Sequence, residues 1–574
     1  MAEYFTPGVY VEEYDNSPRS IEGVGTSTAG FIGFAEKGPT VGAPSLVTSF
    51  KSFTRQFGGF LSEFTYGEYR YLANSVEQFF INGGTRCYVS RVIAPDARAA
   101  KKELGILSIE AANEGKWGNR IQISMGTVTR RKMQLIAQSG NGYIAKTVEG
   151  FREGDLVVAR GEYNRIATIY DNSVTFEKPF ENDVVDTGII PKTVLYLVTV
   201  DVSIRYNDEV ENYGELSFNQ SSPNYIGSRL AGSELVKVTV GQTEQIGNPV
   251  EEVFGQGNPG GIFNLEDGFD GTMNLVTPAT FIGTDAGPGK RTGIQSFLEN
   301  STVSMMAIPG ITDPEVIVAL IAHCESLKSR IAVFDMPGDL YKTKDLIEYR
   351  NIIDSTYGAM YHPWIQVFDR SSNKTDYIPP SGAVLGVYSR TDINRGVHKA
   401  PANEIVFCTG LKVNYTKAEQ DILNPEGVNL IRAIPGQGIR VWGARTASSN
   451  SAFKYVNVRR LFIYVEESIK ANTNWVVFEP NDTALWQRVS LTISSFLDSM
   501  WRTGMLAGST PSEGYFVEIG PSTMTRDDIM NGRLICNIGI APSRPAEFVI
   551  FRVTQHTAES GGGTEAEGRP AAEL

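Results

Sequence analysis

Strand and helix patterns alternate in two separate stretches of this chain, and this alternation limits its possible folds most. In residues 22–97, a short apolar strand pattern at 29–35 precedes apolar positions at helical spacing over 69–81. Another strand pattern follows at 86–92, after glycines that suit the end of a helix. Strands that alternate with helices pair in parallel and carry the helices on their faces. We therefore expect an α/β domain that begins in this stretch.

The second stretch, residues 263–435, repeats the alternation. Pro314 stands near the first position of a helical pattern that runs to about residue 329, and a strand pattern follows at 330–334. A second helix is expected at 345–353 and a second strand at 364–368. This alternation likewise implies parallel strands with helices on the faces of the sheet.

Residues 98–262, which separate the two stretches, have a different character. Helical spacing fades there, and strand patterns such as 120–125 and 194–204 alternate with polar turns. This composition predicts a β-rich insertion in the α/β fold.

The C-terminal part, residues 436–557, returns to a mixed pattern. A helix is expected at 458–472 and a last strand at 548–554, whereas residues 558–574 lack the apolar content to fold and are expected to be disordered. An amphipathic helix of about five turns is marked by Leu485, Val489, Ile493, Phe496, Leu497 and Met500.

The first 21 residues are typical of an extended arm. Val9, Tyr10 and Val11 follow a Pro-Gly break and continue into alternating apolar and acidic side chains, which is a strand pattern. A single terminal strand is not stable by itself. The arm must therefore pair with a sheet, either in its own chain or in another copy.

The charge and hydropathy of the chain exclude two classes of partner. The formal net charge is −13 and no block of lysine and arginine stands out, so the basic footprint that nucleic acid requires is missing. The longest apolar run, 316–322, is far too short for membrane insertion. The N-terminus has neither the basic flank nor the apolar segment of a signal peptide. We expect a protein that is made in the cytoplasm and stays there or leaves by lysis.

Three glycine-rich segments resemble binding loops but lack what those loops require. Residues 255–260 satisfy GxGxxG, yet Pro259 and the residues after it do not open a helix. Residues 287–291 lack the first glycine of a P-loop, and Arg291 stands where it needs Ser or Thr. Residues 265–271 are acidic, but their spacing does not match calcium ligands. No cofactor is predicted.

The residue types that carry metal or nucleophilic chemistry form no recognisable pattern. The histidines lack zinc-ligand spacing, the cysteines form no CxxC pair, and no G-x-S-x-G elbow is present. We therefore predict no catalytic and no metal-binding residues, and a chain that is not an enzyme. The residues considered are His323, His362, His398, His556, Cys87, Cys324, Cys408 and Cys536.

Short segments spread over nearly the whole chain carry a common resemblance. Each is weak alone, but their order is that of contractile tail sheath proteins, the family that serves phage tails, R-type bacteriocins and contractile injection systems. Residues 126–260 carry no such match. The matching segments are 4–13, 30–33, 38–39, 79–89, 115–119, 395–403, 441–446, 455–461, 475–481 and 545–548.

The resemblance implies an α/β multidomain fold with a subtilisin-like α/β domain and an α+β C-terminal domain. The His-Gly-Thr-His and Gly-Thr-Ser-Met signatures of subtilisin proteases are absent, so protease activity does not follow from the fold name. The expected parts are an N-terminal arm strand (1–21), the first part of the core α/β domain (22–97), a β-rich outer insertion (98–262), the subtilisin-like domain (263–435), the C-terminal domain with its arm (436–557) and a disordered tail (558–574).

The family links its subunits by exchanging terminal strands, which add to the sheet of a neighbour's C-terminal domain. Contacts of this kind do not close, so they build a helical filament or stacked rings. Residues 22–25 and 540–545 are expected to act as hinges during contraction. The arm residues implied by the resemblance are Val9, Tyr10, Val11, Phe548, Val549, Ile550, Phe551 and Val553.

The resemblance also implies a function and a set of partners. The chain is expected to polymerise with itself around an inner tube protein, to meet baseplate and terminal cap proteins, and to contract so that the tube crosses a target envelope. Its place is then a virion tail or similar particle made in the bacterial cytoplasm. The family places this C-terminal domain near the tube, which makes Arg488 and Arg502 candidate tube-facing residues. The alternative is a subtilisin-like or other α/β hydrolase.

Overall fold

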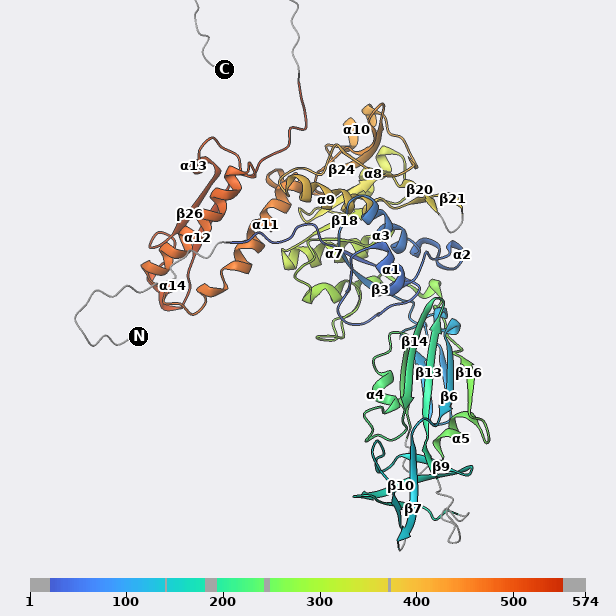
Figure 1. Cartoon of the computed structure of the whole chain (residues 1–574). Coiled ribbons are helices and arrows are strands. Elements are labelled where there is room, and N and C mark those ends of the chain that lie inside the picture. The colour runs from blue at the N-terminus through green and yellow to red at the C-terminus, as the bar shows by residue number, and fades with distance from the viewer. Residues whose placement is uncertain (1–20, 140–141, 181–193, 242–247, 370–372, 551–574) are drawn as a thin grey trace, which may run out of the picture.

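The computed structural model describes residues 21–139, 142–180, 194–241, 248–369 and 373–550. They form a central α/β body, a long β-rich limb that extends from one side of it, and a C-terminal unit of helices with one small sheet (Figure 1). This is the mixed α/β fold of several parts that the sequence patterns predict.

A nine-stranded sheet forms the centre of the body. Strands β3, β1, β17, β18, β19 and β24 lie side by side in this order and pair in parallel. Antiparallel strands complete the edges: β2 beside β3, and β25 and then β22 beyond β24. The bounds are β1 Ala29–Phe34, β2 Ser45–Val47, β3 Cys87–Val92, β17 Met305–Ala307, β18 Ile331–Asp335, β19 Gly358–His362, β22 Glu404–Ile405, β24 Val428–Ile434 and β25 Gly438–Val441.

Helices cover both faces of this sheet, because successive strand residues point to opposite sides. Phe31 faces a core that α3 and α9 complete, and its neighbour Ile32 faces a second core beneath α6, α7, α8 and α10. Smaller helices α1 and α2 lie near α3 (Figure 1). The bounds are α1 Phe50–Phe57, α2 Glu63–Tyr66, α3 Leu72–Ile81, α6 Pro278–Ile282, α7 Pro314–Leu327, α8 Thr343–Arg350, α9 Ser381–Arg395 and α10 Lys417–Leu423.

The ends of α7 follow from its sequence. The Asp313 side chain accepts a hydrogen bond from the Glu315 amide, Pro314 fills the first turn, and Lys328 ends the helix in a left-handed conformation. The strand expected at 364–368 forms as β20 (Ile365–Asp369), but it leaves the central sheet. It pairs antiparallel with β21 (Lys374–Ile378) and β23 (Gly410–Leu411), while β19 supplies the parallel strand after α8.

The limb consists of two sheets and a barrel. Strands β14, β13, β6 and β16 form one sheet, β15, β5 and β4 another, and six strands close a small barrel in the order β10, β11, β8, β7, β12 and β9. Helices α4 (Ile226–Leu230) and α5 (Pro249–Phe254) lie beside them. The strand bounds are β4 Lys101–Leu104, β5 Leu107–Ala111, β6 Gln122–Val128, β7 Lys132–Ser139, β8 Gly142–Ala145, β9 Leu156–Ala159, β10 Glu162–Tyr170, β11 Ser173–Phe176, β12 Val194–Leu197, β13 Thr199–Tyr206, β14 Glu209–Leu216, β15 Val236–Val240 and β16 Gly260–Asn264.

Arg91 joins the limb to the body. Its guanidinium, 2% exposed, donates to the carbonyl oxygens of Ala35, Glu36, Gly38 and Glu114 at 2.8–3.3 Å. Burial lowers the pKa of Arg91 to about 10, which leaves it charged at neutral pH. Several charge-assisted hydrogen bonds therefore hold the root of the limb in one position.

The C-terminal unit packs two long helices against a two-stranded sheet. The amphipathic helix expected from the sequence is α12 (Thr483–Arg502), and the expected 458–472 helix is α11 (Val456–Asn472). The apolar side of α12 contacts β26 (Tyr515–Ile519) and β27 (Cys536–Ile540). Short helices α13 (Pro511–Gly514) and α14 (Arg526–Met530) flank the strands.

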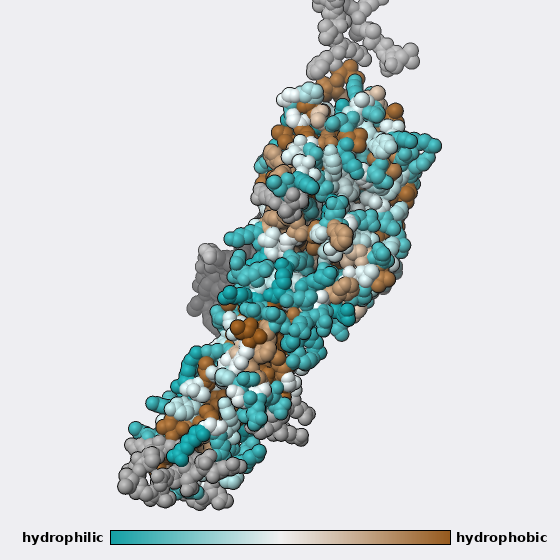
Figure 2. Space-filling model, turned by 90° about the vertical axis from the view of Figure 1, so that its right-hand side faces the viewer, coloured by the Kyte–Doolittle hydropathy of each residue, from teal (hydrophilic) through white to brown (hydrophobic). Residues whose placement is uncertain are grey.

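Hydrophilic residues dominate the face of the molecule shown in Figure 2, and its hydrophobic residues form small, separate groups. Among the described residues, no helix combines the length and apolar character that crossing a membrane requires.

Candidate intersubunit surface

The sheet of the C-terminal unit consists of two antiparallel strands, with Val517 opposite Ile538. In the part of the chain that is described, neither β26 nor β27 pairs with another strand. The Ala541 amide donates to the Gly514 carbonyl at 2.8 Å, and paired backbone groups alternate along an antiparallel ladder. The backbone groups of Val517 and Ile538 therefore point away from the ladder, toward the two edges.

The C-terminal end of the described chain is exposed. Phe548, Val549 and Ile550 are 72%, 68% and 80% exposed and lie in no strand. Exposed apolar residues in an extended segment suit addition to a sheet edge that offers unpaired backbone groups. The other arm residues, Val9, Tyr10, Val11, Phe551 and Val553, lie outside the described residues, as does the tail expected at 558–574.

The first described residues run along helix α11. The Val24 amide donates to the Ser468 hydroxyl at 3.1 Å, and the Asn472 side chain donates to the Glu22 carbonyl at 2.9 Å. A Cβ atom on Gly23 would lie 1.9 Å from the Tyr464 hydroxyl oxygen. Residues 22–25, expected as a hinge, therefore lie close against α11 and are held by its side chains.

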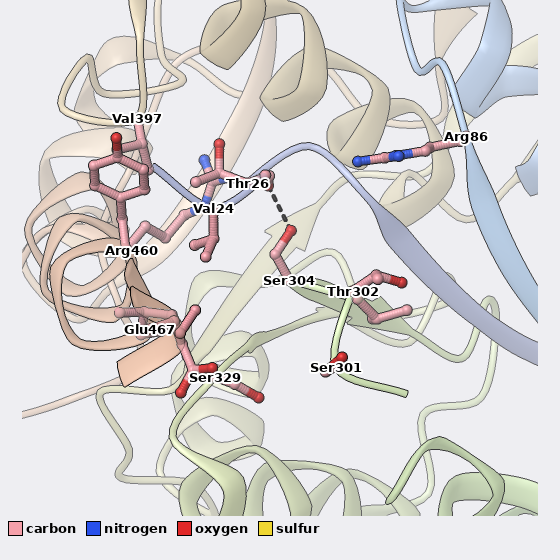
Figure 3. A pocket seen from close by; sticks show the side chains of 15 residues that line it. Val24, Thr26, Arg86, Ser301, Thr302, Ser304, Ser329, Val397, Arg460 and Glu467 are labelled. Carbon is pink, nitrogen blue, oxygen red and sulfur yellow. Dashed lines mark hydrogen bonds between the residues drawn. The ribbon is translucent and has the colours of Figure 1, made fainter. Parts of the chain in front are cut away.

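A buried ion pair adjoins this segment. Arg460 and Asp392 have side chains that are each 3% exposed, with Nη1 and Oδ1 2.9 Å apart. The Thr26 hydroxyl donates to Asp392 at 2.7 Å, and Arg460 donates to the Thr26 carbonyl at 2.9 Å. Figure 3 shows Val24, Thr26 and Arg460 beside a cavity of about 300 Å³, with Ser304 hydrogen-bonded to Thr26.

A second polar cluster holds Glu547, the residue before Phe548. Arg445 donates to both carboxylate oxygens, at 2.9 and 2.7 Å, and the Tyr455 hydroxyl donates at 2.8 Å. Asn424 donates to the carboxylate at 2.6 Å. Burial alone would raise the pKa of Glu547, but these hydrogen bonds outweigh it and hold the pKa below its ordinary value.

The two candidate tube-facing arginines lie on α12. Arg488 and Arg502 are mostly exposed, and each forms an ion pair within the C-terminal unit. Arg488 lies 3.2 Å from Glu479, and Arg502 lies 2.7 Å from Asp498. The structure holds no second protein, so their role at a tube stays a prediction.

Several titratable side chains in the central body are buried and form hydrogen bonds within the fold. Asp335 accepts hydrogen bonds from the Ser381 amide and hydroxyl and from the Gly310 amide, and Asp335 and Ser381 are fully buried. Burial raises the pKa of Asp335 to about 6. His362 lies 2.9 Å from the Tyr415 hydroxyl, and burial lowers the pKa of His362 to about 3. These hydrogen bonds lie in the buried interior of the central body.

The described residues contain no group of three or more His, Cys, Asp or Glu that is placed to hold a metal ion. Arg291, in the P-loop-like segment, pairs with Asp285 and Glu299. Asp270, in the acidic segment, accepts a hydrogen bond from the Lys116 amide. These side chains stabilise loops.

Sequence reasoning missed the two polar clusters. Arg445, Tyr455, Arg460 and Glu547 all occur in segments that carry the family resemblance. The resemblance therefore pointed to these segments. No local pattern predicted that Arg445 would pair with a carboxylate 102 residues away.

Comparisons with known proteins agree with this architecture. Residues 286–447 match the phage tail sheath protein central domain, and residues 448–556 match the phage tail sheath C-terminal domain. A protein of Pseudomonas aeruginosa, named as a prophage major tail sheath protein, is 26% identical over 285 residues, or 47% of this chain and 71% of that protein. The tail sheath protein of Escherichia phage P2 is 23% identical over 306 residues, or 51% of this chain and 75% of its own length.

A solved structure extends the likeness to the whole chain. The sheath complex of an extracellular contractile injection system, in its contracted state, aligns with 97% of this chain and 99% of its own, with a TM-score of 0.53 and 22% identity. At this identity the likeness concerns the fold. The two adjoining domain matches and the tail sheath relatives show that the chain belongs to the contractile tail sheath family.

Proposed function

We propose that this chain is the sheath subunit of a contractile tail or injection system, and that it polymerises around an inner tube and shortens to drive the tube through a target envelope. The observation that carries the proposal is the two-stranded sheet β26–β27, whose outer edges have no further strand among the described residues. The family membership and the likeness to a sheath complex support it.

The proposed linkage is exchange of terminal strands between copies. Val9, Tyr10 and Val11 from one copy, and the strand that begins at Phe548 from another, would add to the open edges of β26 and β27 in a third. Each added backbone hydrogen bond contributes about 0.5–1.5 kcal/mol, and every subunit repeats the contact. The exposure of Phe548, Val549 and Ile550 supports this assignment.

The finer assignments belong to the same proposal. The central body would be the family's subtilisin-like domain without protease activity, and the limb its outward-facing insertion, with the divisions expected from the sequence at 21/22, 97/98, 262/263, 435/436 and 557/558. The partners would be further copies, an inner tube protein, baseplate proteins and cap proteins, in an assembled particle. No observation favours the hydrolase alternative.

Deletion of residues 2–14 tests the linkage. The variant should remain a folded monomer, because the core begins after these residues, but it should form no tubes under conditions in which the intact chain does. Electron microscopy and circular dichroism measure the two properties. Normal tubes from the variant would mean that the N-terminal arm pairs within its own chain or is not needed, and the proposed linkage would be wrong.

Removal of residues 548–574 tests the second arm in the same way. Clean protein should also show only background peptidase, esterase and nucleotide hydrolysis. A turnover that disappears with a single change of Ser381 or His362 would favour the enzyme alternative.

A further inference from the structure

Both ends of the described chain contact α11, the N-terminal end along the helix and the C-terminal end at its start. The N-terminal root, residues 22–26, contacts side chains from Arg460 to Asn472. The C-terminal root, residues 543–547, contacts Tyr455 just before the helix and Asn457 in its first turn. Figure 1 shows α11 between the central body and the helices of the C-terminal unit.

The N-terminal root is held by specific contacts. Ser468 is fully buried and accepts the Val24 amide, and Gly23 lies against Tyr464 where no Cβ atom fits. The cavity under this segment means that it is not embedded along its length (Figure 3). A few hydrogen bonds to α11 therefore determine much of the position of residues 22–26.

The C-terminal root crosses from the C-terminal unit back to the body. The Ser543 hydroxyl donates to the Gly504 carbonyl at the end of α12, and the Asn457 side chain donates to the Ser543 carbonyl at 3.3 Å. Four residues later, the Glu547 carboxylate is bound by Arg445 and Tyr455. Charge-assisted pairs of this geometry fix orientation as well as position.

Helix α11 is itself tied to both parts of the molecule. Its Arg460 forms the buried pair with Asp392 of α9 and stacks over Tyr388, with its guanidinium 4.9 Å from the ring centroid. Leu461 and Val465 pack into the core shared with α12. A buried ion pair specifies geometry more than it adds stability, so α11 is oriented on the central body.

We propose that α11, together with Tyr455 that caps its start, is the common anchor of both chain ends, with Ser468 and Glu547 as positioning residues for the N-terminal and C-terminal roots. This inference rests on the proposed exchange of arms between copies. A helix of 17 residues is a rigid element whose residues keep fixed distances from one another, so the two roots are held in a fixed relation. When a neighbouring copy displaces one arm, the other arm then moves as well, because no flexible segment between the two roots takes up the movement.

The opposite arrangement is a loose tether, in which the roots rest on α11 without being positioned by it. The two arrangements differ in how local changes act. With a loose tether, removing one hydrogen bond at a root changes neither the local opening of that root nor the order of the assembly.

Two variants remove one hydrogen bond each without leaving a buried charge unpaired. Ser468→Ala removes the acceptor of the Val24 amide, and Tyr455→Phe removes one donor to Glu547. Hydrogen exchange of the full-length monomer should become about fivefold to tenfold faster at residues 22–26 in the first variant and at 543–548 in the second, as expected for loss of one hydrogen bond. Unchanged exchange at both roots would overturn the anchoring.

Glu348→Gln is the matched control, because Glu348 forms an exposed pair with Lys344 on α8, away from both roots. It should leave exchange at the roots unchanged. Equal acceleration in the control would show that the effect is not local to α11 and would count against the inference.

The assembly test combines Ser468→Ala with Glu547→Gln. Tubes of this variant should form, but the twist between successive layers should vary more from subunit to subunit than in unmodified tubes imaged by cryo-electron microscopy. Tubes as regular as the unmodified ones, despite faster exchange at the roots, would overturn α11 as the coupling element. That result would leave arm exchange itself intact, which deletion of residues 2–14 tests separately.

Discussion

The barrel at the far end of the limb and the small sheet of the C-terminal unit differ in whether their strands have open edges. At the far end of the limb, six strands close into a barrel, so that each has a neighbour on both sides. The C-terminal unit has β26 and β27 alone among the described residues, with outward backbone groups at Val517 and Ile538. A closed barrel leaves no edge to pair, whereas a two-stranded ribbon is marginally stable by itself.

The family matches follow the same division. They cover residues 286–556, which contain the open sheet, α11 and the C-terminal root, and they leave out the whole limb. The matched residues thus include the two-stranded sheet β26–β27, whereas the closed barrel lies outside them. Under the proposed function, the limb would be a self-contained attachment and the C-terminal unit would join other copies.

The largest effect is expected from closing the open edges. Val517→Pro and Ile538→Pro each remove an N–H group that points away from the β26–β27 ladder, and an edge strand tolerates proline there. The monomer should keep its fold, whereas tube formation should be abolished by at least one of the variants. Circular dichroism and electron microscopy measure the two results.

Phe516→Pro is the contrasting variant, since alternation places the Phe516 backbone inside the ladder. It should unfold the small sheet and reduce thermal stability. If both edge variants assemble as well as the unmodified chain, the sheet is not the site where copies join.

A weaker, pH-dependent effect is expected at the C-terminal root. The pKa of Glu547 in the folded chain lies below its ordinary value of 4.5, so its contribution to stability is present above pH 4.5 and is lost as the pH falls through the folded-state pKa. Hydrogen exchange at residues 543–548, corrected for intrinsic rates, should accelerate below about pH 4.5. Glu547→Gln should remove this pH dependence, and its persistence would assign the effect to another carboxylate.

The barrel should be dispensable for assembly. Val128 and Thr199 are directly opposite on β6 and β13, so residues 129–198 are replaceable by a two-residue Asn-Gly turn. Loss of Leu156 and Val198 from the neighbouring core should lower the free energy of unfolding by about 3–6 kcal/mol. Tubes should still form, with a smaller outer diameter in electron micrographs. A folded variant that never assembles would contradict the peripheral role of the limb.

Local patterns predicted much of the fold. The apolar spacing from Leu485 to Met500 correctly predicted the buried face of α12, and Pro314 predicted the first turn of α7. The strand near Trp364 was also predicted, but not its departure from the central sheet, because periodicity does not specify which strands pair. The sequence could not predict closure of the barrel for the same reason.

The two polar clusters could not be predicted because they join distant residues. Arg460 and Asp392 are 68 residues apart, and Arg445 and Glu547 are 102 residues apart. A charged residue in a helical pattern is usually exposed, so nothing local distinguished Arg460, which is buried, from Arg488, which is not. Such pairs become evident only when the fold brings α9, α11 and the C-terminal root together.

The smallest effect on the isolated chain is expected at Arg488 and Arg502. Both lie in exposed ion pairs on α12, and such pairs contribute about 0–1 kcal/mol. Reversing both charges to Glu should therefore change thermal stability little and leave tube-free polymerisation intact, because the open edges of β26 and β27 are untouched. If α12 faces an inner tube, the same variant should polymerise more slowly on purified tubes. Equal rates with and without the tube would remove Arg488 and Arg502 from that contact and confine the partner surface of the C-terminal unit to its sheet edges.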